Sequence, residues 1–388
     1  MLKRLYVNNY KTLINFDFKI DSDEYYKHSA LFIGKNGAGK TSIAEVLQIF
    51  QKIGKGQGNL LETEIGNNNS TIPPIVSNNY FSFNQTNSPM EFELEAEIEN
   101  HNIKYLFSLE LKHSTFLSVK REQLFINGNR KFDRNEADIS LKDDQINSFK
   151  YDWHSIYFPI YQDKDNKQNC LIKSFKEWLK NMVIISPIPK NMQSKINNKS
   201  LFLQQDASNI TDWYSYVVGE NPDDYGEIKT KYLLHVFPDF EKFHISSDDY
   251  GNKNLNIVFR NGKKDISISF DMLSDGEKCL ILAAFILIAS KVKGNIFCFW
   301  DEPDNYLAIS EVEYFIATLQ KFFLSAGQIF MTTHNPEVML KFPEDKTYRL
   351  YRSDHLSPAR LGTIAEWRKD NNFEGNIINA WINGDLDE

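Results

Sequence analysis

A glycine-rich loop near the N-terminus carries the clearest chemical signal in the sequence. Residues 34–42 read GKNGAGKTS, with the spacing G-x-x-x-x-G-K-[ST], between an apolar run at 30–33 and a helical pattern that starts at Lys40. Glycines there let backbone N–H groups turn toward phosphate oxygens, and the helix N-terminus adds the positive end of its dipole. We expect Lys40 to reach the β- and γ-phosphates of ATP and Thr41 to ligate Mg²⁺. The predicted binding residues of this loop are Asn36, Gly37, Gly39, Lys40, Thr41 and Ser42.

A pair of acidic residues follows a fully apolar run in the C-terminal half. Residues 296–303 read IFCFWDEP, and such a run is typical of a central strand buried on both faces. Asp301 at its end can bind Mg²⁺ through water. Glu302 is placed to orient and deprotonate an attacking water, a role worth roughly 10²–10⁴-fold in rate. An acidic turn without a catalytic role can also follow a core strand. The functional interpretation of the pair therefore depends on the glycine-rich loop at 34–42.

Two further motifs flank this pair. Residues 273–278 read LSDGEK before an apolar helix, and Ser274 with Glu277 has the spacing of a helix capping box. A capped helix end with Gly276 in its first turn can also present N–H groups to an anion, so both interpretations can hold. Residues 330–336 read FMTTHNP and place His334 at the end of another apolar strand.

These four motifs, in this order, resemble ABC-type ATPases, most closely the branch that contains SMC proteins, RecF and the OLD family. The resemblance implies that two copies pair head to tail, so that Ser274 and Gly276 of one copy contact the γ-phosphate held by the other. It also implies that His334 senses that phosphate and that Lys11 contacts the nucleotide. ATP and Mg²⁺ are the implied cofactors.

The sequence departs from this family in three places. The motif at 273–278, which resembles the family's signature motif, has Ser-Asp-Gly-Glu where the family usually has Ser-Gly-Gly-Gln. The segment 304–307 is followed by Ala308, where relatives often carry His or Asp, which leaves communication between subunits and turnover rate open. The Q-loop glutamine of the family has three candidates here, namely Gln193, Gln204 and Gln205, and no feature of the sequence decides among them.

The elements around the motifs predict an α/β fold. With the resemblance, we expect an ABC-type ATPase head with a mostly parallel core sheet, an antiparallel side sheet and an inserted, mostly helical subdomain. Alternation of apolar and polar residues predicts strands within 2–20 and 90–132, and Asn261-Gly262 predicts a hairpin. Segment 54–90 reads as a long loop. The expected domains are an N-terminal lobe at 1–134, a helical insertion at 135–250 and a C-terminal lobe at 251–388.

Composition limits the expected partners and location of the protein. The net charge of −8 argues against a general nucleic-acid coat protein, although one face can still be basic. Of the three cysteines, Cys279 and Cys298 lie in apolar runs, which predicts buried, reduced thiols and fits a cytoplasmic location. The most apolar stretch, 280–290, is about half the length of a membrane span, so we expect no membrane insertion.

Two functions remain open at this point. The first is an ATPase, forming a dimer or higher homo-oligomer, that restrains or activates a separately encoded effector such as a nuclease. Stand-alone members of the branch that it resembles act in bacterial antiphage defence, as in the Septu and PARIS systems, and we expect no nuclease activity in the chain itself. The alternative is a RecF-like repair ATPase that closes on DNA, for which the basic stretch at 190–199 is the best support. The subunit of a transporter fits less well, because a long segment separates Lys40 from Leu273.

Overall fold

The computed structural model describes residues 1–20, 26–61, 63–65, 70–112, 116–141, 148–220, 225–247 and 251–387. The chain packs into two compact units. Unit 1 comprises Met1–Lys27, Phe32–Met182 and Glu344–Glu388, and unit 2 comprises His28–Leu31 and Val183–Pro343. No helix within the described ranges is long and apolar enough to cross a membrane.

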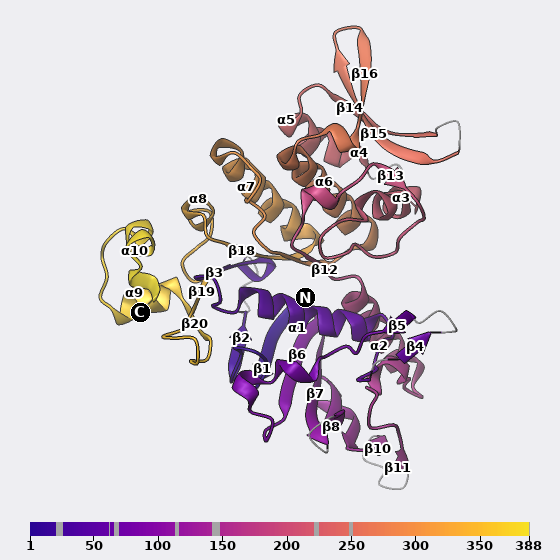
Figure 1. The fold of residues 1–388 in the computed structure, drawn as a ribbon, viewed down its shortest axis with the longest axis vertical. Coiled ribbons are helices and arrows are strands. Elements are labelled where there is room, and N and C mark those ends of the chain that lie inside the picture. Colours follow the sequence, from indigo (N-terminus) through magenta and orange to yellow (C-terminus); the bar gives the residue numbers. More distant parts are fainter. Residues whose placement is uncertain are drawn as a thin grey trace. The chain divides into compact units, whose positions relative to one another are not determined.

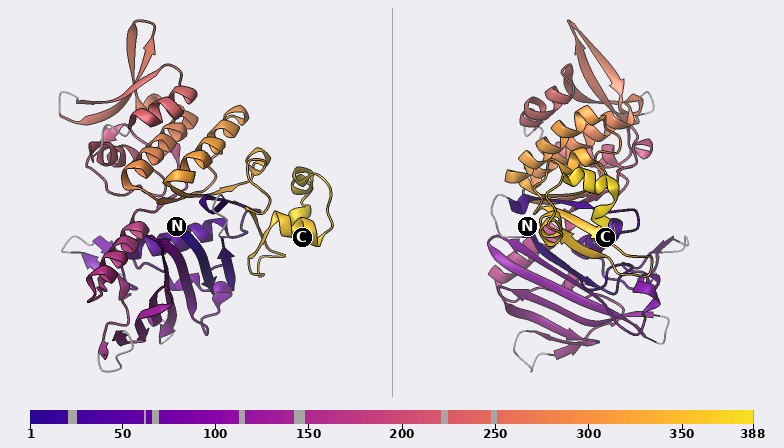
Figure 2. Two further views of the ribbon diagram at one scale, coloured as in Figure 1. Left: turned by 180° about the vertical axis from the view of Figure 1, so that it is seen from behind. Right: turned by 90° about the vertical axis from the view of Figure 1, so that its left-hand side faces the viewer.

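Unit 1 is built on an antiparallel sheet of eight strands, drawn in indigo to magenta in Figure 1. Their order is β11-β10-β9-β8-β7-β6-β1-β2, and Figure 2 shows them as one twisted layer. The strands are β1 (Leu2–Asn8), β2 (Phe16–Lys19), β6 (Met90–Ile98), β7 (His101–Lys112), β8 (Phe116–Ile126), β9 (Asn129–Asn135), β10 (Asp138–Leu141) and β11 (Ser148–Lys150). Every second residue of β6 is buried, as the alternating sequence predicts.

Helix α1 (Lys40–Gly54) covers the apolar face of this sheet and carries the residues that follow the glycine-rich loop. Phe50 of α1 lies edge-on to the rings of Tyr105 and Phe107 on β7, at 6.2 and 5.7 Å between ring centroids. Helix α2 (Asn166–Lys180) packs beside α1, and a Cβ on Gly54 would lie 2.6 Å from that of Leu179. The glycine at the end of α1 therefore permits the close packing of the two helices.

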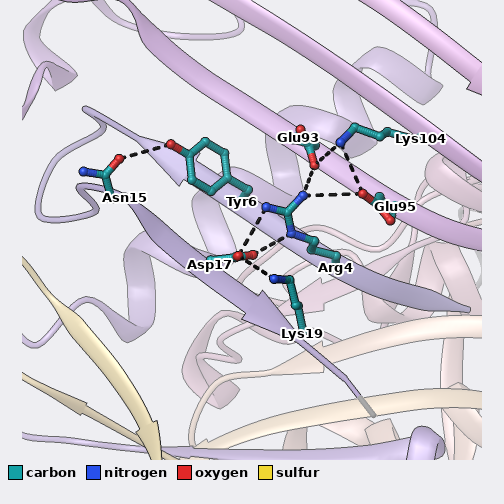
Figure 3. Close-up of polar contacts among 8 residues, drawn as sticks. All are labelled: Arg4, Tyr6, Asn15, Asp17, Lys19, Glu93, Glu95 and Lys104. Atoms are coloured by element: carbon teal, nitrogen blue, oxygen red, sulfur yellow. Dashed lines mark hydrogen bonds and ion pairs between the residues drawn. The ribbon is translucent and has the colours of Figure 1, made fainter. Parts of the chain in front are cut away.

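The opposite face of β2, β1, β6 and β7 carries a network of charged side chains (Figure 3). Arg4 is its centre: its Nε donates to Asp17 Oδ1 at 2.6 Å, and Nη1 contacts Glu93 and Glu95. Lys104 Nζ lies 2.6 Å from the same Glu93 oxygen. Half-exposed pairs of this kind contribute about 0–1 kcal/mol each, so we assign the network to strand register rather than to a large share of stability.

A second charged pair in unit 1 is fully buried. Arg134 of β9 lies 3.4 Å from Glu122 of β8, and neither side chain is exposed to solvent. Glu122 accepts the N–H groups of Tyr157 and Phe158, at 2.9 and 2.7 Å, while Arg134 donates to the carbonyl of Ser155 at 2.6 Å. The pair therefore fastens the segment 152–158 to the sheet, and removing one partner of a buried pair typically costs about 3–5 kcal/mol.

The C-terminal part of unit 1 adds a hairpin and two short helices. Strand β3 (Ser29–Ile33) ends in unit 1 and neighbours β19 (Thr347–Tyr351), which pairs with β20 (Arg360–Thr363). Helices α9 (Ile364–Asp370) and α10 (Ile377–Asn383) follow. Arg349 of β19 donates to the carbonyl of Leu386 at 2.6 Å, which ties the last described turn to the hairpin.

The core of unit 2 is a parallel sheet between apolar helices. Its order is β12-β17-β18-β3, and β17 runs parallel to both β12 and β18. These strands are β12 (Val183–Ile185), β17 (Ile296–Trp300) and β18 (Gly327–Thr333). All residues of β17 and β18 are buried, as expected for central strands. Helix α6 (Asp275–Lys293) is buried without interruption from Lys278 to Ser290, and α7 (Ile309–Ala326) packs beside it.

A smaller antiparallel sheet completes unit 2. Strand β15 (Lys253–Asn261) is its centre and pairs with β13 (Lys195–Ile196), β14 (Phe240–Ser247) and β16 (Lys264–Ser269). Phe243 of β14 lies 5.0 Å from the ring of Phe285 on α6, so this sheet packs on the core helix. Unit 2 also contains α3 (Ile210–Glu220), α4 (Tyr225–Ile228), a π-helical turn (Lys229–Leu233), α5 (Leu234–Val236) and α8 (Pro336–Met339).

Most of the expected elements are present. The predicted hairpin around Asn261-Gly262 is the β15–β16 pair, and Cys279 and Cys298 are buried free thiols. The loop expected at 54–90 is wrong in part, because its described residues include the antiparallel pair β4 (Thr63–Ile65) and β5 (Ser70–Ile72). Short polar strands of this kind lack the apolar alternation on which the expectation relied. The three-domain division at 1–134, 135–250 and 251–388 stays a prediction.

Candidate functional site

The glycine-rich loop lies in unit 1, between the end of β3 and the start of α1. Gly37 and Gly39 have φ values of +81° and +116°, which glycine adopts without steric cost. Gly39 is the N-cap of α1 and supplies no side-chain oxygen to the first turn. The N–H groups of that turn are the kind of donors that bind anions at helix N-termini. The glycines that were expected to let the loop turn therefore have positive φ values.

The side chains of the loop have distinct surroundings. Lys40 is buried and its ammonium donates to the carbonyl of Gly34 at 2.5 Å. Thr41 is exposed, whereas Ser42 is buried in the first turn of α1. Asn36 is exposed on the loop. All six predicted residues thus belong to one continuous turn and helix start, as their adjacency in sequence requires.

The acidic pair lies in unit 2, where two parallel strands end side by side. Asp301 and Glu302 follow β17, and Thr332 and Thr333 end β18. The Thr332 hydroxyl donates to Asp301 Oδ1 at 2.5 Å and accepts the backbone N–H of Glu302 at 3.0 Å. Thr332 is fully buried, so one hydroxyl fixes both acidic residues.

Glu302 is held at its carboxylate as well. His334 Nε2 lies 3.2 Å from Glu302 Oε1, and the Asn305 amide donates to Glu302 Oε2 at 2.5 Å. The Glu302 backbone has a φ of +50°, a conformation that typically costs a non-glycine residue about 1–3 kcal/mol. Such strain persists only where surrounding contacts fix it, and here both side-chain oxygens and the N–H are fixed. The Glu302 side chain remains 30% exposed, which leaves the carboxylate open to water.

A buried carboxyl supports the turn that carries Glu302. Asp304 is only 8% exposed and accepts a hydrogen bond from the Thr333 hydroxyl at 2.9 Å. Burial raises the pKa of Asp304 above its ordinary value. The end of β18 therefore uses consecutive threonines, Thr332 and Thr333, to hold the two ends of the acidic turn.

The LSDGEK segment forms the start of α6 in the same unit. Ser274 is the N-cap and exchanges hydrogen bonds with Glu277, so the predicted capping box is present. A Cβ on Gly276 would lie 2.7 Å from the carbonyl oxygen of Tyr306. Unit 2 thus brings the start of α6 against the turn that follows Glu302, and only glycine fits at that contact.

Comparison with family models assigns the chain to a family. A family model described as an AAA ATPase domain matches residues 1–339, most of the chain. The chain belongs to this AAA ATPase domain family. Its members bind nucleotide, and the loop at 34–42, which has the P-loop spacing, lies with the acidic strand end inside the matched residues.

The chain is also similar to individual proteins. The chromosome partition protein Smc of Fusobacterium nucleatum subsp. nucleatum is 28% identical over 134 residues, which are 33% of this chain and 11% of that protein. A solved Smc head, bound to the C-winged helix domain of ScpA, covers 95% of this chain and 99% of its own, with a TM-score of 0.51 and 14% identity. The SMC head domain from Thermotoga maritima matches with a TM-score of 0.46 and 16% identity, over 93% of this chain and 98% of its own. The likeness to the ScpA-bound Smc head, with its TM-score of 0.51, shows an SMC head-like α/β fold for this chain, as the sequence predicted.

Lys11, the remaining predicted ligand of the ATPase domain, has structural partners in unit 1. Its ammonium lies 2.5 Å from Glu45 on α1 and 4.3 Å from the centre of the Tyr80 ring. The turn that holds it is close to the P-loop, because Thr12 Oγ1 lies 3.1 Å from where a Cβ on Gly39 would be. Its nucleotide contact stays a prediction.

Sequence reasoning missed Thr332 and Asn305. Thr332 could have been found, because parallel neighbouring strands end at the same edge and a hydroxyl at the end of one can meet a carboxylate at the end of the other. Asn305 carries no such signal. Gln205 has a backbone contact just after the end of β12, since its carbonyl accepts the N–H of Ser186 at 2.9 Å. That observation favours Gln205, and the assignment stays a prediction.

Proposed function

We propose that this ATPase domain binds ATP on the loop at 34–42 and hydrolyses it with Glu302 as the residue that activates water. The observation that carries the proposal is the fixed carboxylate of Glu302, held at one oxygen by His334 and at the other by Asn305. A general base works when its geometry is set before the reaction, because a misplaced base loses most of its effect. Lys40 would neutralise the phosphates, and His334 would help to hold the attacking water.

Magnesium fits the donor atoms that the chain offers. The hydroxyl of Thr41 and the carboxylate of Asp301 are the hard oxygen ligands that Mg²⁺ accepts beside phosphate oxygens and water. The ion would neutralise charge that develops on the phosphates. The bond from Thr332 would keep the Asp301 carboxylate in one orientation for that task.

We further propose that two copies pair head to tail around ATP, with Ser274 and Gly276 facing the partner's γ-phosphate. Large apolar side chains flank this part of unit 2: Met272 is 78% exposed and Ile309 is 72% exposed. Exposed apolar residues around a binding motif are typical of a surface that another molecule covers. Size measurement of Glu302→Gln with and without ATP tests this step; a size that ATP leaves unchanged would contradict it.

The paired heads would act on a separately encoded effector, with antiphage defence as the proposed setting and a nuclease as the proposed effector. DNA closure of the RecF kind is the second candidate. Lys190, Lys195 and Lys199 favour it, because all three are exposed, and Lys195 lies on the edge strand β13. Proteins bind DNA independently of its sequence through contacts between exposed lysines and the DNA phosphate backbone.

ATP hydrolysis by the purified chain, with and without double- and single-stranded DNA, tests these proposals together. We expect turnover that Lys40→Ala abolishes. Stimulation by DNA that disappears when the three lysines are replaced by alanine would favour the DNA-closing ATPase. A rate indifferent to DNA would favour the effector-linked one. Turnover that survives in Lys40→Ala would contradict the proposed site, and nucleic-acid cleavage that Lys40→Ala abolishes would contradict a separate effector.

A further inference from the structure

The segment Leu350–Ala359, which runs from the end of β19 to the start of β20, contacts the P-loop at each of its three glycines. A Cβ on Gly34 would collide with the carbonyl oxygen of Leu350. The carbonyl of Gly37 accepts a hydrogen bond from Arg352 Nη1 at 2.8 Å. A Cβ on Gly39 would lie 3.4 Å from that of Ala359. The segment Leu350–Ala359 therefore packs against the loop at the three glycines, and we call it the support of the P-loop.

Arg352 is the polar contact of this support, and it binds three carbonyl groups at once. Besides Gly37, its Nε donates to the carbonyl of Ser357 at 2.8 Å and its Nη2 donates to that of His355. The tip of the hairpin is itself fixed by Asp354, which accepts the N–H of Leu356 at 2.8 Å and the Ser357 hydroxyl at 2.7 Å. The guanidinium therefore connects a rigid turn to the apex of the P-loop.

The contact fixes one peptide plane of the P-loop at both ends. The Gly37 carbonyl is bound by Arg352, and the N–H of the same peptide, on Ala38, donates to the carbonyl of Lys35 at 3.1 Å. A peptide unit is planar, so restraint of both groups fixes its rotation. A Cβ added at Gly37 would meet nothing within 4 Å, so without the two hydrogen bonds this residue would allow the rotation freely.

One side of the loop, around Gly37, is not closely packed. A cavity of about 520 Å³ lies beside it, lined by Lys35–Ala38, Leu350–His355, Asn383 and Gly384. A loop next to a cavity of this size lacks close packing on that side, so the hydrogen bond from Arg352 restrains Gly37 where side-chain packing does not. Lys40 binds the Gly34 carbonyl from within the same loop, and Arg352 binds the Gly37 carbonyl from the hairpin.

We propose that Arg352 is a positioning residue that holds the P-loop in its nucleotide-binding conformation through the Gly37 carbonyl. The proposal rests on the proposed function, in that the loop must bind nucleotide. A loop ordered before binding does not lose that conformational freedom when the nucleotide arrives, so the contact should act on affinity. It should leave the chemical step unchanged, because Asp301, Glu302 and His334 are held by contacts within unit 2.

The test measures Mg-ADP affinity by calorimetry and steady-state ATP hydrolysis for Arg352→Ala, Arg352→Lys and the matched control Arg360→Ala. Arg360 is exposed on β20 of the same hairpin, so its removal deletes the same charge. We expect Arg352→Ala to raise the Kd for ADP and the KM for ATP about threefold to tenfold, the range of one ordinary hydrogen bond, because Arg352 is only half-buried. The kcat should change by less than about twofold, as for lost binding alone.

Arg352→Lys separates positioning from charge. A lysine keeps the positive charge but cannot span three carbonyls with a fixed fork, so it should lose most of the affinity that Arg352→Ala loses. Wild-type affinity in Arg352→Ala, full affinity in Arg352→Lys, or an equal loss in Arg360→Ala would each overturn the positioning role. Should Arg352→Ala fail to fold, Arg352→Lys carries the test against Arg360→Ala. Failure of the wild-type chain to bind ADP would instead contradict the proposed function itself.

Discussion

The two units hold their candidate residues in different ways. In unit 1 the P-loop is shaped by backbone: glycines with positive φ, carbonyls bound by Lys40 and Arg352, and close approach of β19. In unit 2 the acidic turn is shaped by side chains, since Thr332, His334 and Asn305 each bind Glu302 or Asp301. A backbone-shaped site is sensitive to added side-chain atoms, and a side-chain-shaped site is sensitive to lost polar groups.

The largest effect is expected for Glu302→Gln in unit 2. The amide keeps the size of the side chain but cannot accept a proton, so kcat should fall by about 10²–10⁴-fold. ADP affinity should stay within about twofold, because the phosphates are bound by unit 1 in the proposed mechanism. Steady-state hydrolysis and calorimetry measure the two quantities. Lys40→Ala is the contrasting variant and should lose both; a Glu302→Gln protein with normal turnover would remove Glu302 from the mechanism.

The next effect is expected for Thr332→Val, which removes one buried hydroxyl and keeps the shape. Asp301 then loses a donor and the Glu302 N–H loses its acceptor, so the turn can shift. A shift of about 1 Å in a reacting group can cost up to about 10²-fold, and we expect kcat to fall roughly tenfold to a hundredfold. Thr332→Ser keeps the hydroxyl and should retain most of the rate. Equal rates in the serine and valine variants would mean that the hydroxyl does not position the acids.

The difference between the units also explains what the sequence could predict. The P-loop is continuous in sequence, so its glycine spacing, Lys40 and Thr41 were readable from nine letters, and the strands and helices around it follow from apolar periodicity. The position of the acidic pair was readable for the same reason, because a buried strand leads directly to Asp301.

Contacts between distant segments were not readable. The bond from Thr332 to Asp301 depends on the pairing of β17 with β18, and the bond from Arg352 to Gly37 joins residues 315 positions apart. A single sequence offers many possible hydrogen-bond partners for polar residues such as these, and the tertiary fold determines which pair forms. The positive φ of Glu302 was equally hidden, because nothing in the residue type favours it.

The third prediction concerns the backbone-shaped loop. Gly34→Ala places a Cβ against the Leu350 carbonyl, so backbone must move, which typically costs about 1–3 kcal/mol. Gly37→Ala meets open space, and its cost is the positive φ alone, about 1 kcal/mol. Denaturant unfolding without nucleotide measures both free energies. Gly34→Ala should be the less stable variant, and the reverse order would mean that β19 does not support the loop.

The smallest effect is expected for Asp304→Asn, measured as stability against pH. Burial raises the Asp304 pKa above its ordinary value of 3.8, with neighbouring Glu302 adding in the same direction and hydrogen bonds from Thr333 and Asn335 opposing it. Above that pKa the folded protein carries an unfavourable buried charge, so Asp304 contributes stability at low pH that is lost as pH rises through the folded pKa. Asparagine keeps an acceptor for Thr333 and has no charge to bury. We expect the variant to melt up to about 2–4 °C higher at neutral pH and to lose this advantage as pH falls toward 3.8. A constant difference between the two proteins at every pH would show that packing, rather than ionisation of Asp304, sets the effect.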